Sequence, residues 1–236
     1  MKRPKIFIGY DKNERISAYT LAHSIQRNAS GLVDITFLDK NKINGYKRPR
    51  HELDSTDFSI SRFAVPYICG YKGYAIFMDC DCVVLGDIYD LWRLKESDDP
   101  ALWCVHQKFY TPKEEVKFLG NIQTCYSFKN WSSVMLFNNE KCTNLTLEAL
   151  NNINLSGLYF HTFRWLSARA VIGTIPPEWN ILIGVHDIPD NPKLLHYTSG
   201  GPYFRQYKNC ETAGIWIEEF KDLAYATDGW VNEKIR

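Results

Sequence analysis

The feature that most constrains the fold is an apolar run over residues 74–85 that two aspartates, Asp79 and Asp81, interrupt. Its isoleucine, phenylalanine and valine side chains are typical of a strand that is buried on both faces. A buried carboxylate is costly unless a positive group neutralises it. We therefore expect the strand to leave its sheet at the aspartates, whose side chains, two positions apart, point to one side.

The same two aspartates predict a binding site for a divalent cation. A cation between them would offset their mutual repulsion, and carboxylate oxygens suit hard ions such as Mg²⁺ and Mn²⁺. An ion held in this way could grip a diphosphate. Three other interpretations remain open. The acids could be turn formers at a strand end, Asp79 could be the nucleophile of a haloacid-dehalogenase-like phosphatase, or Cys80 and Cys82 could ligate zinc.

The phosphatase and zinc interpretations each lack a sequence feature that such proteins usually have. The phosphatase motif normally opens its chain, whereas a strand–helix–strand unit comes first here. The zinc interpretation lacks a second close pair of cysteines.

Composition bounds the function without identifying it. The 236 residues suffice for a substantial core, and we expect residues 1–236 to form a single domain. With 28 Lys and Arg against 27 Asp and Glu, the charge balance predicts no nucleic-acid partner. The seven cysteines follow no disulfide spacing, so we expect free thiols in a reducing cytoplasm. No apolar stretch approaches the length of a transmembrane segment.

The beginning of the chain predicts a parallel strand–helix–strand unit. Residues 5–9 and 34–38 have the apolar character of strands. Between them, Ala18 and Leu21 belong to a stripe with helical spacing, and Asn13 is the expected N-cap. This order is typical of an α/β fold with a right-handed crossover, in which ligands bind at the carboxyl ends of the strands.

Gly9, Tyr10 and Asp11 follow the first strand and so lie at such an end. A planar base could stack on Tyr10 while Asp11 accepts a hydrogen bond from an imide or a ribose hydroxyl. The alternative is an ordinary turn-forming loop.

Apolar periodicity predicts the remaining elements. We expect helices over residues 59–68, 146–151, 160–168 and 211–224, and a strand over residues 101–105. In the first of these helices Arg62 lies off the apolar stripe, so it either faces solvent or neutralises a phosphate.

Two further segments carry specific expectations. In the closing helix, Ile215, Phe220 and Leu223 are the expected apolar contacts. Residues 106–129 form a polar and aromatic loop that is too long for a simple connection. Three of its side chains could face an acceptor: Lys117, Gln123 and Tyr126.

Several segments, taken in order, resemble retaining GT-A-fold glycosyltransferases related to glycogenin and to the lipopolysaccharide galactosyltransferases. Residues 61–63 and 74–92 resemble the segment around the Asp-x-Asp motif of that family. Residues 6–11 resemble the uracil-binding opening of the family, and residues 133–138 resemble the strand after its donor-sugar loop. Residues 177–180 resemble a short segment that ends in asparagine, and residues 193–202 resemble the late histidine-glycine motif. The resemblance implies an α/β, Rossmann-like GT-A fold with a mixed, mostly parallel sheet flanked by helices.

The resemblance also implies roles for single residues. Asp79 and Asp81, joined by His196, would hold Mn²⁺ or Mg²⁺ against the diphosphate of a nucleotide sugar. The residues implied at the nucleotide are Gly9, Tyr10, Asp11, Arg62, Cys80, Gly200 and Gly201. Those implied at the donor sugar or acceptor are Trp131, Ser132, Ser133, His161 and Asn180. The implied activity is retaining hexosyl transfer from a uridine diphosphate sugar to a saccharide, lipid-linked or protein acceptor.

The late motif departs from the family pattern. Gly200 follows His196 one residue later than in the family, and no lysine comes before the proline. Backbone N–H groups of Gly200 and Gly201 could cradle a phosphate instead, aided by Arg205. The residue that contacts the reacting sugar in the family has no equivalent near His161, so no catalytic residue is assigned. A protein that binds nucleotide sugars or carbohydrates without catalysis is therefore a further alternative.

Overall fold

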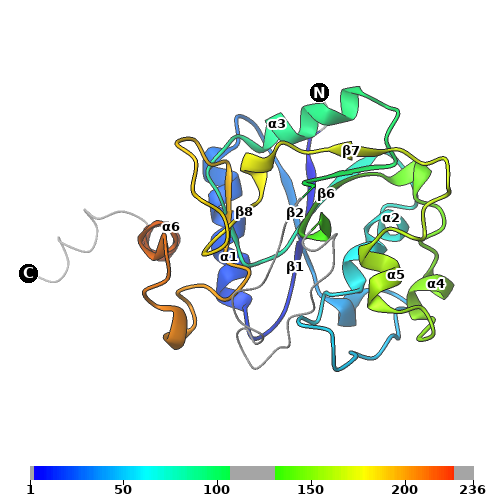
Figure 1. The fold of residues 1–236 in the computed structure, drawn as a ribbon, viewed down its shortest axis with the longest axis horizontal. Helices are drawn as coiled ribbons and strands as arrows, with labels where there is room; N and C mark the ends of the chain where they lie inside the picture. The colour runs from blue at the N-terminus through cyan, green and yellow to red at the C-terminus, as the bar shows by residue number, and fades with distance from the viewer. Residues whose placement is uncertain (1–2, 107–130, 226–236) are drawn as a thin grey trace, which may run out of the picture.

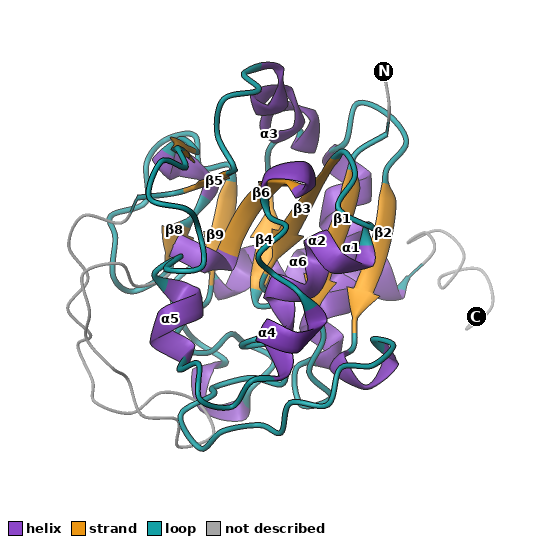
Figure 2. Ribbon diagram, turned by 90° about the vertical axis from the view of Figure 1, so that its right-hand side faces the viewer, coloured by secondary structure: helices purple, strands orange, loops and turns teal. Residues whose placement is uncertain are grey.

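A six-stranded sheet forms the centre of the protein in a computed structural model that describes residues 3–106 and 131–225. Its strand order is β2–β1–β3–β6–β5–β7, and β6 runs antiparallel to both of its neighbours, β3 and β5, while the other pairs are parallel (Figure 2). The strands span Lys5–Gly9 (β1), Asp34–Leu38 (β2), Tyr74–Met78 (β3), Leu102–Cys104 (β5), Val134–Asn138 (β6) and Ile172–Thr174 (β7).

The second part of the long apolar run belongs to a smaller, separate sheet. It contains β4 (Cys82–Val84), β9 (Leu194–His196) and β8 (Ile181–Leu182), in that order. Because β3 ends at Met78 and β4 begins at Cys82, the chain leaves the large sheet at the two aspartates, as predicted. The acids therefore lie between the two sheets, where neither side chain has to be accommodated inside a continuous apolar layer.

Helices lie on both sides of the large sheet (Figure 1). On one side, α1 (Arg15–Asn28) packs against β1 and β4, and α6 (Ala213–Ala224) packs against α1. On the other side lie α2 (Val65–Ile68), α4 (Leu147–Asn151) and α5 (Gly157–His161), while α3 (Ile88–Arg93) follows β4. The predicted α/β fold with a mixed, mostly parallel sheet between helices is confirmed.

The core is centred on β3 and β6. Successive residues Ile76 and Phe77 of β3 point to opposite faces, yet neither has any exposed surface. The strand is thus covered on both faces, as its composition predicts. A second buried cluster joins the small sheet to α6 through Val83, Ile181, Ile183, Leu195, Tyr197 and Trp216.

The helix predicted over residues 160–168 is wrong. The helix α5 ends at His161, and Phe163 has a left-handed φ of 56°, which no helix can continue through. The rings of Phe163 and Trp165 pack against Phe63 at centroid distances of 6.4 and 6.3 Å. The apolar spacing therefore serves an aromatic cluster built on a turn.

The helix predicted over residues 59–68 is shorter and divided. A single 3-10 turn covers Ser61–Ala64, and α2 follows with Pro66 in its first turn, where the missing backbone N–H costs nothing. The first long helix begins after Glu14, and the expected cap by the Asn13 side chain does not form.

The closing helix is present, but its buried face differs from the prediction. Ile215 and Leu223 are 40% and 37% exposed, so the contacts expected from them are wrong. Trp216 is buried instead, and Phe220 stacks on it at a centroid distance of 5.5 Å.

The remaining expectations concern thiols, the long loop and membrane spans. The described cysteines are free thiols, as predicted: Cys69, Cys80, Cys82, Cys104, Cys142 and Cys210. The proposed acceptor contacts Lys117, Gln123 and Tyr126 lie outside the described residues. No helix in the described part of the chain combines the length and the apolar character needed to cross a membrane.

Candidate metal centre

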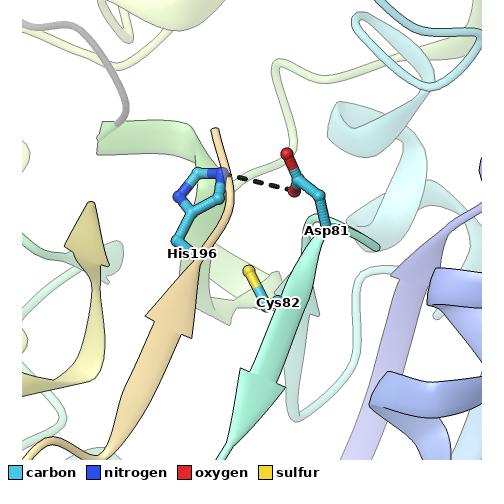
Figure 3. A group of neighbouring side chains, drawn as sticks. All are labelled: Asp81, Cys82 and His196. Carbon is cyan, nitrogen blue, oxygen red and sulfur yellow. Dashed lines mark ion pairs between the residues drawn. The ribbon is translucent and has the colours of Figure 1, made fainter. Parts of the chain in front are cut away.

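Asp81 and His196 meet at the junction of the two sheets. Asp81 immediately precedes β4, and His196 ends the neighbouring strand β9, where it pairs with Cys82. Nε2 of His196 lies 3.2 Å from Oδ1 of Asp81, and the histidine is only 1% exposed (Figure 3). The structure thus brings together an acid and the distant imidazole that the sequence analysis named as metal ligands.

Asn180 fixes the orientation of the His196 ring. Nδ1 of His196 lies 2.9 Å from the amide oxygen of Asn180, whose NH₂ group donates to Oγ of Ser133 at 2.9 Å. With its proton on Nδ1, the ring presents the Nε2 lone pair to the Asp81 carboxylate. Two electron-rich atoms at this distance attract only if a proton or a cation lies between them, so the pair could hold a cation.

Asp79 has a different partner. Nη1 of Arg62 lies 2.6 Å from Oδ1 of Asp79 and donates to the Ser132 carbonyl at 2.9 Å. Arg62 is only 5% exposed, and its guanidinium lies 5.1 Å from the centre of the Phe77 ring. The solvent-facing alternative for this arginine is therefore wrong. Its charge neutralises a carboxylate at a buried strand end, which burial would otherwise make costly.

Two neighbouring serines connect the surroundings of the two acids. The Ser132 carbonyl binds Arg62, and the Ser133 hydroxyl binds Asn180. The Ser133 carbonyl also accepts the backbone N–H of Asp79 at 2.8 Å, which continues the β3–β6 ladder by one hydrogen bond. The serine pair is therefore linked to Asp79 through Arg62 and to Asp81 through Asn180 and His196.

The predicted donor-sugar or acceptor residues lie beside these contacts. Oγ of Ser132 is 2.7 Å from Nδ1 of His161. Burial, followed by the charge of Arg62, lowers the pKa of His161 to about 3, so this ring is neutral at physiological pH. Trp131 stacks on His106 with ring centres 4.5 Å apart.

The two motif cysteines differ in their surroundings. A Cys82 sulfur, an Asp81 oxygen and a His196 nitrogen lie within 4.8 Å of one another, the one such group of potential ligands among the described residues. Cys80 has no exposed surface, and its carbonyl accepts the Ser17 hydroxyl at 2.9 Å. Burial raises the pKa of both thiols well above the usual range. Joint ligation of zinc by Cys80 and Cys82 is not found in this group.

The Gly9–Asp11 segment lies level with the start of the Asp79–Asp81 segment, because β1 and β3 are parallel with Ile8 opposite Met78. Tyr10 is half-buried, with its ring edge toward Phe37 at 6.3 Å. The buried Asp11 carboxylate accepts the backbone N–H groups of Asn13 and Asp57, both at 2.9 Å. Asp11 therefore shapes the loop in which Tyr10 lies.

Aromatic rings leave no room for a side chain at the two glycines after His196. Gly200 has a φ of +125°, and a Cβ there would lie 2.6 Å from the Tyr207 ring. A Cβ on Gly201 would lie 2.3 Å from the Tyr203 ring. The Gly200 N–H donates to the Tyr197 carbonyl at 2.8 Å, and Arg205 is exposed on the following turn.

Glu14 and Tyr203 form a contact that the sequence analysis missed. Glu14 is 1% exposed, and its carboxylate accepts the Tyr203 O–H at 3.0 Å. Burial and the charges of Glu14 and Asp81 raise the pKa of Tyr203 well above its usual value, so it remains a donor. The bond ties the start of α1 to the turn after His196. No local pattern reveals it, because the partners are 189 positions apart.

The comparison with curated proteins decides the family. No family model matches the chain. Protein CDI of Arabidopsis thaliana is 41% identical over 230 residues, which cover 94% of this chain and 88% of the relative. The chain belongs to the Protein CDI family. For this member of the Protein CDI family, the aligned region spans nearly the whole chain.

Solved structures of glycosyltransferases have the same GT-A fold. LgtC, a galactosyltransferase, matches with a TM-score of 0.65 at 13% identity, over 96% of this chain and 98% of LgtC. GlyE of Streptococcus pneumoniae matches with a TM-score of 0.62 at 16% identity, over 100% of this chain and 64% of GlyE. The bifunctional glycosyltransferase WbbM matches with a TM-score of 0.62 at 15% identity, and the chain spans 49% of its length. The resemblance predicted from the sequence is confirmed at the level of the fold.

Proposed function

We propose that this protein transfers a hexose from a uridine diphosphate sugar to a saccharide, lipid-linked or protein acceptor, with retention of configuration. The observation that supports the proposal best is the Asp81–His196 pair, placed at a strand end in a fold that known glycosyltransferases share. Burying a carboxylate against an imidazole lone pair costs free energy unless a proton or a cation lies between them, and a divalent ion can take that position.

Asp81 and His196 are the residues that we propose as ligands of Mn²⁺ or Mg²⁺, with Asp79 as a further ligand. Carboxylate oxygens suit Mn²⁺ and Mg²⁺, so the two aspartates fit the ion, and His196 would add one nitrogen ligand. When bound, the ion neutralises negative charge that develops on the departing nucleoside diphosphate. Asn180 keeps Nε2 of His196 directed at Asp81 by holding Nδ1, which is the usual way in which an outer hydrogen bond positions a metal-binding histidine.

We propose that the nucleotide lies across the adjoining ends of β1 and β3. The half-buried ring of Tyr10 offers a stacking surface for the base, and Asp11 holds the loop around it. Arg62, already beside Asp79, is placed to approach the phosphates or the donor sugar. Gly201 and Arg205, in the segment that follows His196, are the residues that we propose to contact a phosphate.

The proposed chemistry is front-face attack, in which the acceptor hydroxyl adds to the anomeric carbon as the diphosphate leaves from the same side. The leaving phosphate oxygen takes the acceptor proton, so no protein base is required. Ser132 binds Arg62 through its carbonyl and lies beside the neutral His161, and we propose that these two residues contact the sugar hydroxyls.

A donor-hydrolysis screen tests this function. The purified chain is incubated with a panel of nucleotide sugars and Mn²⁺, and released nucleoside diphosphate is measured. We expect release from a uridine diphosphate sugar that stops when the metal is chelated and in Asp81→Asn. The matched control Asp222→Asn removes an exposed acid of α6 and should keep full activity.

Two results would contradict the proposal. Hydrolysis of a simple phosphoester with a trapped phosphoaspartate at Asp79 would identify a phosphatase. Binding of nucleotide sugars with no release for any donor or acceptor tested would identify a protein that binds without catalysis.

A further inference from the structure

The register of the small sheet places a thiol beside the candidate metal ligands. Cys82 and His196 are directly paired residues of the antiparallel strands β4 and β9. Side chains in such a pair lie on the same face and within contact range. Asp81 is the residue immediately before Cys82, and Figure 3 shows all three side chains gathered at the same end of the two strands.

We propose that Asp81, Cys82 and His196 form a three-ligand site for Zn²⁺. Zinc is borderline soft and is commonly bound by one thiolate together with imidazole and carboxylate groups. Mg²⁺ and Mn²⁺ favour oxygen donors and have little use for the sulfur. The thiol therefore gives this centre an affinity for zinc that Asp81 and His196 alone would not provide.

The observed distances fit a tetrahedral centre. Zinc bonds of about 2.0–2.1 Å to oxygen and nitrogen require ligand atoms about 3.3 Å apart. Nε2 of His196 and Oδ1 of Asp81 are 3.2 Å apart, so these two atoms need no rearrangement. All three donor atoms already lie within 4.8 Å of one another, and zinc binding would draw the Cys82 sulfur closer to the other two. The thiol releases one proton to solvent when it binds.

The surroundings support a selective site. Asn180 binds the far nitrogen of His196, which leaves Nε2 for a metal. The cysteine at the other side of Asp81, Cys80, is equally buried but stands outside the ligand group. It therefore provides a matched control for the role of a buried thiol in this segment.

The zinc site shares Asp81 and His196 with the proposed manganese site, and one consequence rests on the proposed function. Zinc held by three protein ligands occupies the position that the donor-bound ion needs, so Zn²⁺ should inhibit transfer in competition with Mn²⁺. The site itself does not depend on transfer, and its test uses the protein without any nucleotide.

The test is titration with Co²⁺, a spectroscopic substitute for zinc, followed by zinc competition. We expect a thiolate-to-cobalt absorption band in the wild type and in Cys80→Ala. The band should be absent in Cys82→Ala, and zinc affinity should fall at least about tenfold in that variant. An unchanged band and affinity in Cys82→Ala would overturn the proposal.

A second measurement keeps the test decisive if Cys82→Ala does not fold. Zinc-edge X-ray absorption of the wild type, loaded with one equivalent of zinc, should show one sulfur at about 2.3 Å together with nitrogen and oxygen neighbours. A shell of nitrogen and oxygen alone would exclude Cys82 as a ligand. Both measurements are independent of glycosyl transfer, so failure of one proposal is distinguishable from failure of the other.

Discussion

Asp79 and Asp81 are separated by one residue, yet they belong to two different contact networks. Asp79 is paired with Arg62, and Asp81 with His196. The first partner comes from the turn before α2 and the second from β9, so the motif connects the large sheet to the small one. The two aspartates are therefore expected to differ in function: Asp79 is paired with a fixed cation of the protein, whereas Asp81 faces the imidazole of His196.

This difference predicts a strong coupling between Arg62 and Asp79. Arg62→Met should destabilise the fold by about 3–5 kcal/mol, because it leaves a largely buried carboxylate without its cation. Adding Asp79→Asn should recover part of the loss, with a coupling energy of about 1–3 kcal/mol in a double-mutant cycle measured by urea unfolding. Strictly additive effects would show that the ion pair contributes nothing specific.

Asn180 is expected to act on metal affinity through His196. Asn180→Ala removes the acceptor at Nδ1, so Mn²⁺ affinity measured by calorimetry should fall about 10–100-fold. Asn154→Ala, which changes an exposed asparagine, is the control and should bind Mn²⁺ like the wild type. Equal Mn²⁺ affinity in Asn180→Ala and the control would show that Asn180 does not support metal binding by His196.

The turn after His196 is expected to tolerate no side chain at Gly201. In Gly201→Ala the new Cβ must displace the Tyr203 ring, which lies 2.3 Å from its position, and so weaken the Tyr203–Glu14 hydrogen bond. Gly214→Ala is a matched change in α6, where nothing lies within 4 Å of the new Cβ. Thermal unfolding should show a loss for Gly201→Ala and a gain of about 0.5–1 kcal/mol for Gly214→Ala. A gain in both variants would contradict the packing described here.

The buried thiol of Cys142 is expected to make the free energy of unfolding fall as the pH rises in the alkaline range. Burial raises the pKa of its thiol from 9.0 to about 12. Because the folded pKa lies above the unfolded value, its stabilising contribution is complete below pH 9 and is lost as the pH rises toward 12. Over that interval Cys142→Ala should reduce the slope of unfolding free energy against pH by about 1.4 kcal/mol per pH unit. The exposed change Ser167→Ala should leave the slope unaltered, and an unaltered slope in Cys142→Ala would refute the assignment.

Sequence patterns predict those structural elements that depend on the residues of one short segment. The strands β1 and β2 and the break at the aspartates follow from apolar runs and from the cost of burying a carboxylate. The helix expected near Phe163 fails because its apolar spacing serves ring packing around Phe63, which is a tertiary contact.

In the candidate site, too, contacts between distant segments could not be predicted from the sequence. Asp81 and His196 could be named from their motifs, but the Arg62–Asp79 pair and the Glu14–Tyr203 bond depend on how distant segments meet. Cys82 could be suspected as a zinc ligand, but only the β4–β9 register identifies His196 as its neighbour.

The most direct test of the account is the binding of uridine diphosphate to His196→Ala in the presence of Mn²⁺, measured by calorimetry. His51→Ala, which removes an exposed histidine, is the control. We predict that the Mn²⁺-dependent affinity falls at least about tenfold in His196→Ala and is unchanged in the control. The same affinity in His196→Ala as in the wild type would contradict the claim that Asp81 and His196 hold a metal ion against the nucleotide.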